Sequence, residues 1–249
     1  MLEARLFSKA PLLKQLCLGV PAPDGGEEKK LAACSAIIRH PESWKLTRIR
    51  ETPMNSTITS ALKEWAVAVD ALEQGKTIML LRKGGIHEQG GRFTVAHDQI
   101  LLYPTYEHQQ PSLLKPDYAS LVTPVTSGWH PETVRIGAYA QIADIFQVSD
   151  EQIVSALLPF QIWNEQFVST RLKWKPRQPL YVILLRTYKL ASAQVIPYHQ
   201  EYGGCTSWID LAEPISIKGA EPVLDEAAYT EQVIEIDRII REKSYTPFL

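Results

Sequence analysis

Cysteine is scarce in this sequence. The 249 residues contain 3 cysteines, and Cys17, Cys34 and Cys205 are too far apart to form a Cys-x-x-Cys pair. Three scattered thiols exclude a disulfide framework and a zinc site built from paired cysteines. Cys205 lies in "GGCTSW", but no sequence feature ties it to a histidine base, so nucleophilic catalysis has little support. We therefore expect free or buried thiols.

Long apolar runs are also missing. Hydrophobic residues make up 45% of the chain, yet no run approaches the roughly 20 residues that a membrane helix needs. The start, "MLEARLFSKAPLLKQLCLGVPAP", is interrupted by Lys14 and by prolines, which is unlike a signal peptide. The sequence therefore predicts a cytoplasmic protein with no membrane partner.

Two nucleic-acid-related enzyme fingerprints are incomplete. Restriction-type nucleases hold Mg²⁺ with an Asp followed later by Asp or Glu-x-Lys. Asp117 offers a first acid, but no later Asp or Glu has Lys two positions on, and the pattern occurs only at Glu27 and Glu28. "KGGIHE" resembles the start of a Nudix box, but the Arg-Glu-x-x-Glu-Glu run that should follow is absent. Both chemistries are excluded.

The charge is unevenly distributed along the chain. Of 26 Lys and Arg and 28 Asp and Glu, 9 and 6 lie in residues 1–53, which leaves 17 and 22 for the rest. The first segment shows no helical or strand period, and "PAPDGGEEKK" cannot offset its ordering entropy by burial. We expect residues 1–53 to be a disordered or misannotated N-terminal extension, with translation starting at Met54. A regulatory arm is the alternative.

The remaining residues, 56–245, predict a single globular domain. A helix is expected from Thr59 or Ser60 to Gly75, because Leu62, Trp65, Ala66, Val69 and Leu72 fall at helical spacing. Apolar runs predict strands at 77–82 and 99–105, paired across the intervening loop, and at 133–148, 180–190 and 205–211. Further helices are expected from Ser149 or Asp150 and over 225–243. The fold class is α+β, a compact mixed or antiparallel sheet with flanking helices.

Several segments occur in an order that resembles a known family. They are the "ALKEW" helix, the "LRKGGI" turn, "PTYEHQ", "LYVILLRTYKL" and "GCTSW". Together they resemble an uncharacterised bacterial family, domain of unknown function 1802, from about Ala61 to Leu211. The resemblance implies a link to restriction-modification, because some members look fused to, or encoded with, a restriction-endonuclease-like domain. It implies no catalytic residues.

A cluster of histidines and carboxylates is the candidate metal site. His87, Glu88 and His108 lie within 22 residues, together with His97, Asp98 and Glu107. Imidazole and carboxylate groups are good zinc or manganese ligands. The spacings match no known ligand set, so a hydrogen-bonded loop is the simpler interpretation. We expect no metal and no cofactor, and keep a metal-dependent hydrolase or nuclease as an alternative.

Two basic features favour anion binding instead. In "RKGG", Gly84 and Gly85 can turn successive N–H groups toward one point, beside the charges of Arg82 and Lys83. Residues 166–200 contain no acid, and basic and aromatic side chains alternate there. Basic groups neutralise phosphates and aromatic rings stack on bases. The candidate residues in this stretch are Arg171, Lys173, Trp174, Lys175, Arg177, Arg186 and Tyr188.

The prediction from these features is a nucleic-acid or nucleotide recognition module, accessory to restriction or defence against foreign DNA, with a binding role favoured over an enzymatic one. Because the body is acidic overall, selective contact is favoured over general coating of DNA. The remaining alternative is a protein-interaction subunit or homo-oligomer using the C-terminal helix, whose apolar seam must be buried. That seam consists of Tyr229, Val233, Ile236 and Ile240.

Overall fold

The computed structural model describes residues 56–83, 98–174, 179–204 and 206–244, together with the backbone of two short strands at 88–89 and 92–93. Several predictions lie outside this range and stay predictions. They concern residues 1–53, Gly84, Gly85, His87, the side chain of Glu88, Lys175, Arg177 and Cys205.

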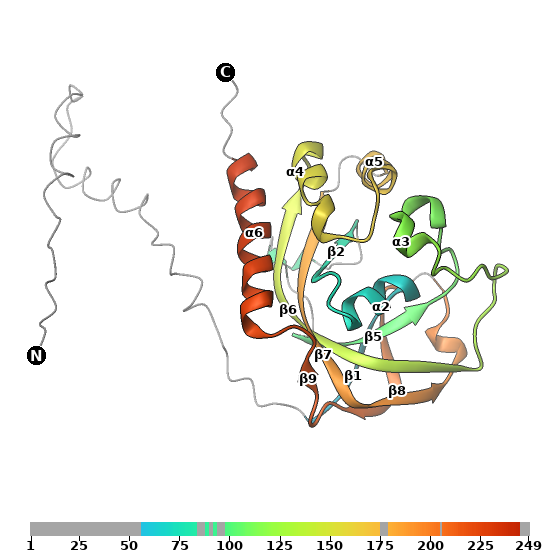
Figure 1. The fold of residues 1–249 in the computed structure, drawn as a ribbon. Helices are drawn as coiled ribbons and strands as arrows, with labels where there is room; N and C mark the ends of the chain where they lie inside the picture. Colours follow the sequence, from blue (N-terminus) through green and yellow to red (C-terminus); the bar gives the residue numbers. More distant parts are fainter. Residues whose placement is uncertain are drawn as a thin grey trace, which may run out of the picture. The chain divides into compact units, whose positions relative to one another are not determined.

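The described chain forms an α+β domain, as the sequence predicted (Figure 1). The strands are β1 (Thr57–Trp65), β2 (Met79–Arg82), β3 (Glu88–Gln89), β4 (Arg92–Phe93), β5 (Gln99–Thr105), β6 (Thr133–Val148), β7 (Leu180–Pro197), β8 (Trp208–Ser216) and β9 (Glu221–Pro222). The α-helices are α2 (Ala66–Glu73), α3 (Pro116–Ala119), α4 (Glu151–Ala156), α5 (Glu165–Lys173) and α6 (Glu226–Ser244). Short 3₁₀ turns occur at Pro111–Leu113, Leu158–Phe160 and Gln200–Tyr202.

One mixed sheet organises the domain. Its strand order is β2-β7-β6-β5-β1-β8, with β9 paired to β7. Only β1 and β5 are parallel among the described pairs of this sheet, and the others are antiparallel. Since β1 and β5 run in the same direction, their carboxyl ends, at Trp65 and Thr105, lie side by side. The candidate site lies at these carboxyl ends of β1 and β5.

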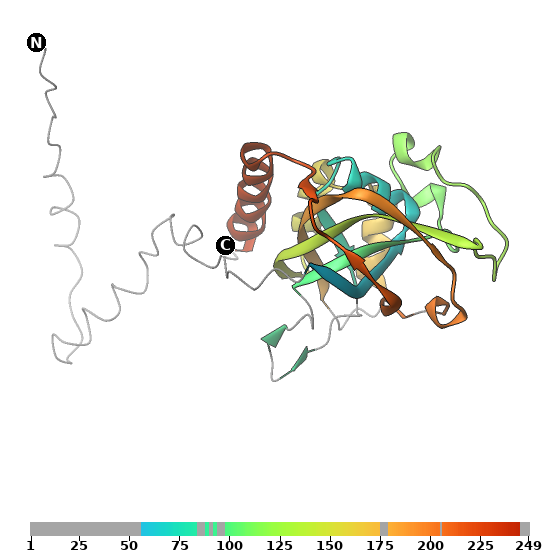
Figure 2. The same ribbon diagram turned by 90° about the horizontal axis from the view of Figure 1, so that it is seen from below.

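The sheet buries apolar residues on both faces. Leu62 and Ile100 belong to a core that also takes residues from α2, α4, α5 and α6, whereas their neighbours Ala61 and Leu101 belong to a second core. Successive residues of a strand point to opposite faces, so the two cores lie on the two sides of the sheet. The helices cover the first core, and the curved sheet folds over the second, as the bending of β6 and β7 shows in Figure 2.

Two features of the predicted secondary structure are wrong. The expected helix from residue 59 is strand β1 up to Trp65 and helix α2 only from Ala66. Ala61 and Leu62 are both fully buried, because β1 is a central strand, so the alternation that would have identified it is missing. The strands at 77–82 and 99–105 do not pair, since β2 pairs with β7, and β5 lies between β1 and β6.

Other expectations are confirmed. Strand β6 covers 133–148, and its register with β7 shifts between Ile136 and Ala138, at Gly137. Asp150 caps α4 by accepting a hydrogen bond from the backbone N–H of Gln152 at 2.7 Å. The C-terminal helix is α6, which lies beside α4 in Figure 1. Within the described ranges, no helix is both long and apolar enough to span a bilayer.

Candidate functional site

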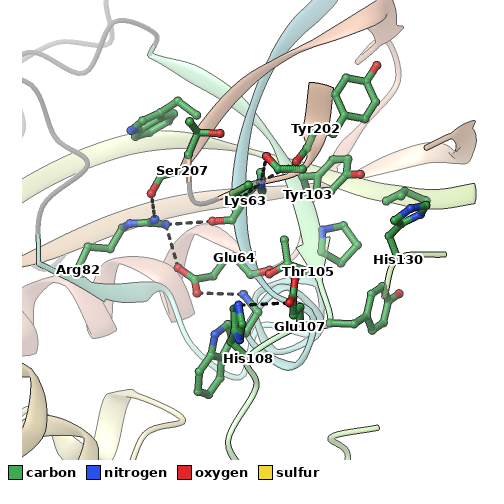
Figure 3. A pocket seen from close by; sticks show the side chains of 18 of the residues that line it. Lys63, Glu64, Arg82, Tyr103, Thr105, Glu107, His108, His130, Tyr202 and Ser207 are labelled. Carbon is green, nitrogen blue, oxygen red and sulfur yellow. Dashed lines mark hydrogen bonds and ion pairs between the residues drawn. The ribbon is translucent and has the colours of Figure 1, made fainter. Parts of the chain in front are cut away.

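A cleft of about 1220 Å³ opens where β1, β2 and β5 end. Its walls come from the ends of these strands, the carboxyl-terminal part of α5, the loop around residues 128–131, and residues 198–208 (Figure 3). The lysines and arginines that line it are Lys63, Arg82, Lys83 and Arg171. The carboxylates Glu64 and Glu107 and many aromatic rings line it as well. Of the residues predicted to bind anions, Arg82, Lys83, Arg171 and Trp174 therefore line one common cleft.

The Arg82 guanidinium donates hydrogen bonds to three groups of the protein. Its Nη1 donates to Glu64 Oε2 at 2.9 Å and to the Lys63 carbonyl at 3.2 Å, and its Nη2 donates to Ser207 Oγ at 2.6 Å (Figure 3). The Arg82 and Glu64 side chains are each only 13% exposed. The guanidinium thus joins β2 to β1 and to the segment before β8. These contacts give Arg82 a structural role, because its guanidinium holds three segments of the fold together.

The amines of Lys63 and Lys83 also donate hydrogen bonds to the protein. Lys63 Nζ donates to three successive carbonyl groups, at 2.6 Å for Tyr202, 3.1 Å for Gly203 and 2.8 Å for Gly204. Lys83 is buried, its Nζ donates to the Leu172 carbonyl at 2.8 Å, and burial lowers the pKa of its amine. Both ammonium groups are therefore used in hydrogen bonds to backbone carbonyls of the protein.

Among the cleft cations that the structure describes, Arg171 is the one without a hydrogen-bond partner in the described ranges. Its guanidinium carbon lies 5.0 Å from the centre of the Phe167 ring and 5.9 Å from that of Trp174. It makes no hydrogen bond to any residue that the structure describes. Burial lowers the pKa of Arg171, partly offset by the charge of Glu64. Stacking holds this guanidinium in place while its N–H groups make no hydrogen bond to the described residues. A guanidinium in this state can bind phosphate or carboxylate in bidentate geometry.

Aromatic rings continue from Arg171 across the floor of the cleft. Phe167 stacks on Trp163 at 4.2 Å, and Trp163 meets Trp65 edge-on at 4.9 Å. Helix α5 contributes Phe167 and Arg171. Asn164 caps it, accepting from the Phe167 N–H at 3.1 Å while its amide donates to the Ser112 and Leu114 carbonyls. We call the row from Trp65 through Trp163, Phe167 and Arg171 to Trp174 the aromatic row.

The other end of the cleft is also aromatic. His130 stacks on Tyr198 at 3.7 Å, and the Tyr103 and Tyr202 rings meet edge-on at 5.8 Å. The Tyr103 hydroxyl is buried and has no hydrogen-bond partner in the described part of the chain. Burial is the main cause that raises its pKa, so this group remains a neutral hydroxyl. The sequence did not single out these residues.

Three of the residues predicted to bind nucleic acid lie outside the cleft lining. Arg186 donates to Glu226 Oε2 at 3.2 Å and lies 4.3 Å over the Tyr229 ring, which anchors the start of α6. Tyr188 stacks on Tyr139 at 4.9 Å and donates to Gln141 Oε1 at 3.1 Å. Neither residue lines the cleft. Lys173 is exposed at the end of α5, also outside the cleft lining.

The residues that the structure describes do not form the predicted metal site. His108 lies beside Glu107, with its Nε2 3.4 Å from Glu107 Oε1, and its side chain is 70% exposed. Across the described ranges, no group of three His, Cys, Asp or Glu side chains is arranged to hold a metal ion. His87 and the side chain of Glu88 lie outside those ranges.

The described residues define an α+β domain whose mixed sheet carries an aromatic and basic cleft at the ends of its parallel strands. The chain belongs to the family "Domain of unknown function (DUF1802)", whose model matches residues 61–235. This confirms the resemblance found in the sequence and extends it into α6.

Comparisons beyond the family are distant. The crystal structure of ASCH from Zymomonas mobilis is 12% identical, with a TM-score of 0.38 over 71% of this chain and 93% of that one. Two single-residue mutants of the same protein give TM-scores of 0.34 and 0.35 at 12% and 11% identity, over 71% of this chain and 94% and 96% of theirs. Similarity at this level says nothing about what this chain binds. Among curated proteins, none matches the sequence.

Proposed function

We propose that the cleft binds a single-stranded nucleic acid or nucleotide, with Arg171 contacting a phosphate and Trp174 stacking on a base. The observation that carries this proposal is the state of Arg171 among the cleft cations. Lys63, Arg82 and Lys83 donate to protein acceptors, whereas Arg171 lies beside an aromatic ring and donates to none of the residues that the structure describes.

The exposed tryptophans support the same ligand class. Large apolar side chains that are well exposed include Trp129 at 43% and Trp174 at 45%, and both line the cleft. Exposed tryptophan at a concave site is typical of a binding surface, because it offers a large rigid ring to a partner. Aromatic rings beside basic groups are the arrangement that binds single strands, since bases stack and phosphates pair with cations.

We expect the nucleic acid to bind at the cleft and not over the whole protein surface. The body of the chain is acidic overall, and only Arg171 among the described cleft cations has uncommitted donors. The salt dependence should therefore correspond to few phosphate contacts. The association with restriction or defence, which the family resemblance alone implied, stays a prediction.

Titration of a labelled single-stranded oligonucleotide by fluorescence anisotropy, over a range of salt concentrations, tests the proposal. Arg171→Ala should weaken binding and reduce the salt slope by about 0.7, because one phosphate is no longer neutralised by the protein. Trp174→Ala should weaken binding by about 5- to 150-fold, with a small change in slope, because stacking contributes about 1–3 kcal/mol per base.

Lys173→Ala is the matched control. It removes an equal charge from the same helix but from a side chain outside the cleft lining, so it should change affinity less than Arg171→Ala does. Equal effects of the two variants would mean diffuse electrostatic attraction and would refute a role for the cleft. Absence of binding by the unmutated protein at low ionic strength, where attraction is strongest, would refute the whole proposal.

A further inference from the structure

The segment "PTYEHQ", residues 104–109, forms part of the cleft wall through its first five residues. It begins with the last two residues of β5, and its side chains contact neighbouring segments. Thr105 Oγ1 donates to the Glu64 carbonyl at 2.9 Å, and Gln109 Oε1 accepts from the Val67 N–H at 3.1 Å. These two contacts fix the segment to the end of β1 and the start of α2. The proposed function so far gives this motif no role.

Glu107 connects this segment to the loop that carries Trp129. Its Oε1 accepts from the Gly128 N–H at 2.7 Å and from Ser127 Oγ at 3.0 Å. The hydrogen bond from Gly128 is the main cause that lowers the pKa of Glu107. The loop itself has no helix or strand between residues 120 and 132. This carboxylate is one of the contacts that connect the loop to the sheet, together with the stacking of His130 on Tyr198.

The geometry around Glu107 orients the Trp129 ring. Tyr106 meets Trp129 edge-on, with ring centres 5.8 Å apart and an interplanar angle of 89°. His108 has φ 65°, the only positive φ of a non-glycine residue in the described chain. A histidine in this conformation is held by its surroundings at some energetic cost. The segment thus keeps a tryptophan that is 43% exposed in one orientation at the cleft.

We propose that Trp129 is a second stacking position, oriented by Glu107, and that the ligand is an oligonucleotide segment spanning both positions and not a single nucleotide. This inference rests on the proposed function. Trp129 and Trp174 come from segments far apart in the chain, and Trp129 makes its ring contact with Tyr106, outside the aromatic row. Two separate platforms suit two bases. The cleft, at about 1220 Å³, also exceeds the roughly 300–1,000 Å³ usual for small-molecule sites.

The test compares a six-residue oligothymidylate with thymidine monophosphate. Trp129→Ala should weaken binding of the oligonucleotide by about 5- to 150-fold and leave the mononucleotide unchanged. Trp174→Ala should weaken both. Loss of oligonucleotide binding in Trp174→Ala but not in Trp129→Ala would overturn the second position and leave the proposed function standing.

Double-mutant cycles test the positioning role of Glu107. If Glu107 acts through Trp129, the effects of Glu107→Ala and Trp129→Ala on affinity should not add, whereas those of Glu107→Ala and Trp174→Ala should add. Glu107→Gln should retain most of the affinity, because its amide oxygen can accept from the Gly128 N–H. Full additivity with Trp129→Ala, or a loss in Glu107→Gln as large as in Glu107→Ala, would refute positioning. If the unmutated protein binds neither probe, both proposals fail together.

Discussion

Arg82 offers the sharpest test of whether a cleft cation belongs to the fold or to a ligand. Truncation to alanine removes hydrogen bonds of 2.9 Å to Glu64, 2.6 Å to Ser207 and 3.2 Å to a backbone carbonyl. It removes the ion-pair partner of Glu64, whose side chain is 13% exposed in the intact protein and also accepts from the Trp65 N–H at 2.9 Å. Breaking a buried ion pair by removing one partner costs about 3–5 kcal/mol. We take about 3 kcal/mol, because the pair is partly exposed.

That destabilisation corresponds to a melting temperature lower by about 6–12 °C in a domain of this size. Urea unfolding followed by tryptophan fluorescence would measure it. Glu64→Gln combined with Arg82→Ala should recover part of the stability, because the unpaired charge is gone. Arg238→Ala is the control, since that arginine bridges Glu235 and Glu242 on the exposed face of α6 and should matter much less. Unchanged stability of Arg82→Ala, with loss of oligonucleotide affinity, would refute the structural role.

Two further predictions concern α6. Ile236 is fully buried, so Ile236→Asp should destabilise the domain by at least ~3 kcal/mol in urea unfolding. The control is Ile234→Asp, which should destabilise the domain far less because the Ile234 side chain is 50% exposed. Equal destabilisation by the two variants would mean that α6 does not pack on the domain. Burial raises the pKa of Tyr229 from 10.0 to about 12. The folded state therefore holds this proton more tightly, and the resulting stability is present below pH 10 and lost as the pH rises toward 12. In Tyr229→Phe, unfolding free energies over this range should fall less steeply than in the unmutated protein, and identical slopes would contradict the assignment.

Sequence patterns identified the strands and helices that have one clear periodicity. Strand β6 and helix α6 were predicted close to their observed limits because turn residues and caps bound them. Strand β1 was not, because a central strand buried on both faces carries no alternation, and Leu62, Trp65 and Ala66 also fit a helix. The partners of β2 and β5 could not be inferred either. Strand pairing depends on residues about 100 positions away, such as Leu81 with Val182.

The sequence identified part of the cleft lining, and the remainder was missed for a related reason. Composition pointed to Arg171 and Trp174 through a stretch without acids, and both line the cleft. Composition cannot show which cations are already paired, since the partner of Arg82 lies on β1 and that of Lys83 is a backbone carbonyl of α5. The wall that holds Trp129 was visible only as the motif "PTYEHQ". Its role depends on a hydrogen bond from the Gly128 N–H to Glu107, which no local pattern indicates.

The position of β1 between β5 and β8 has a consequence for the order in which the protein becomes functional during synthesis. Ser60 on β1 bonds to Asp210 on β8, 150 residues later in the chain. At about 5–20 residues per second, a ribosome leaves one edge of β1 unpaired for about 8–30 s after that strand is made. An open strand edge is a template for aggregation. The segment that Lys63 and Arg82 anchor, residues 202–207, emerges in the same late interval. A nascent chain should therefore gain its cleft only when its exposed edge is closed, so that ligand binding reports the completed fold.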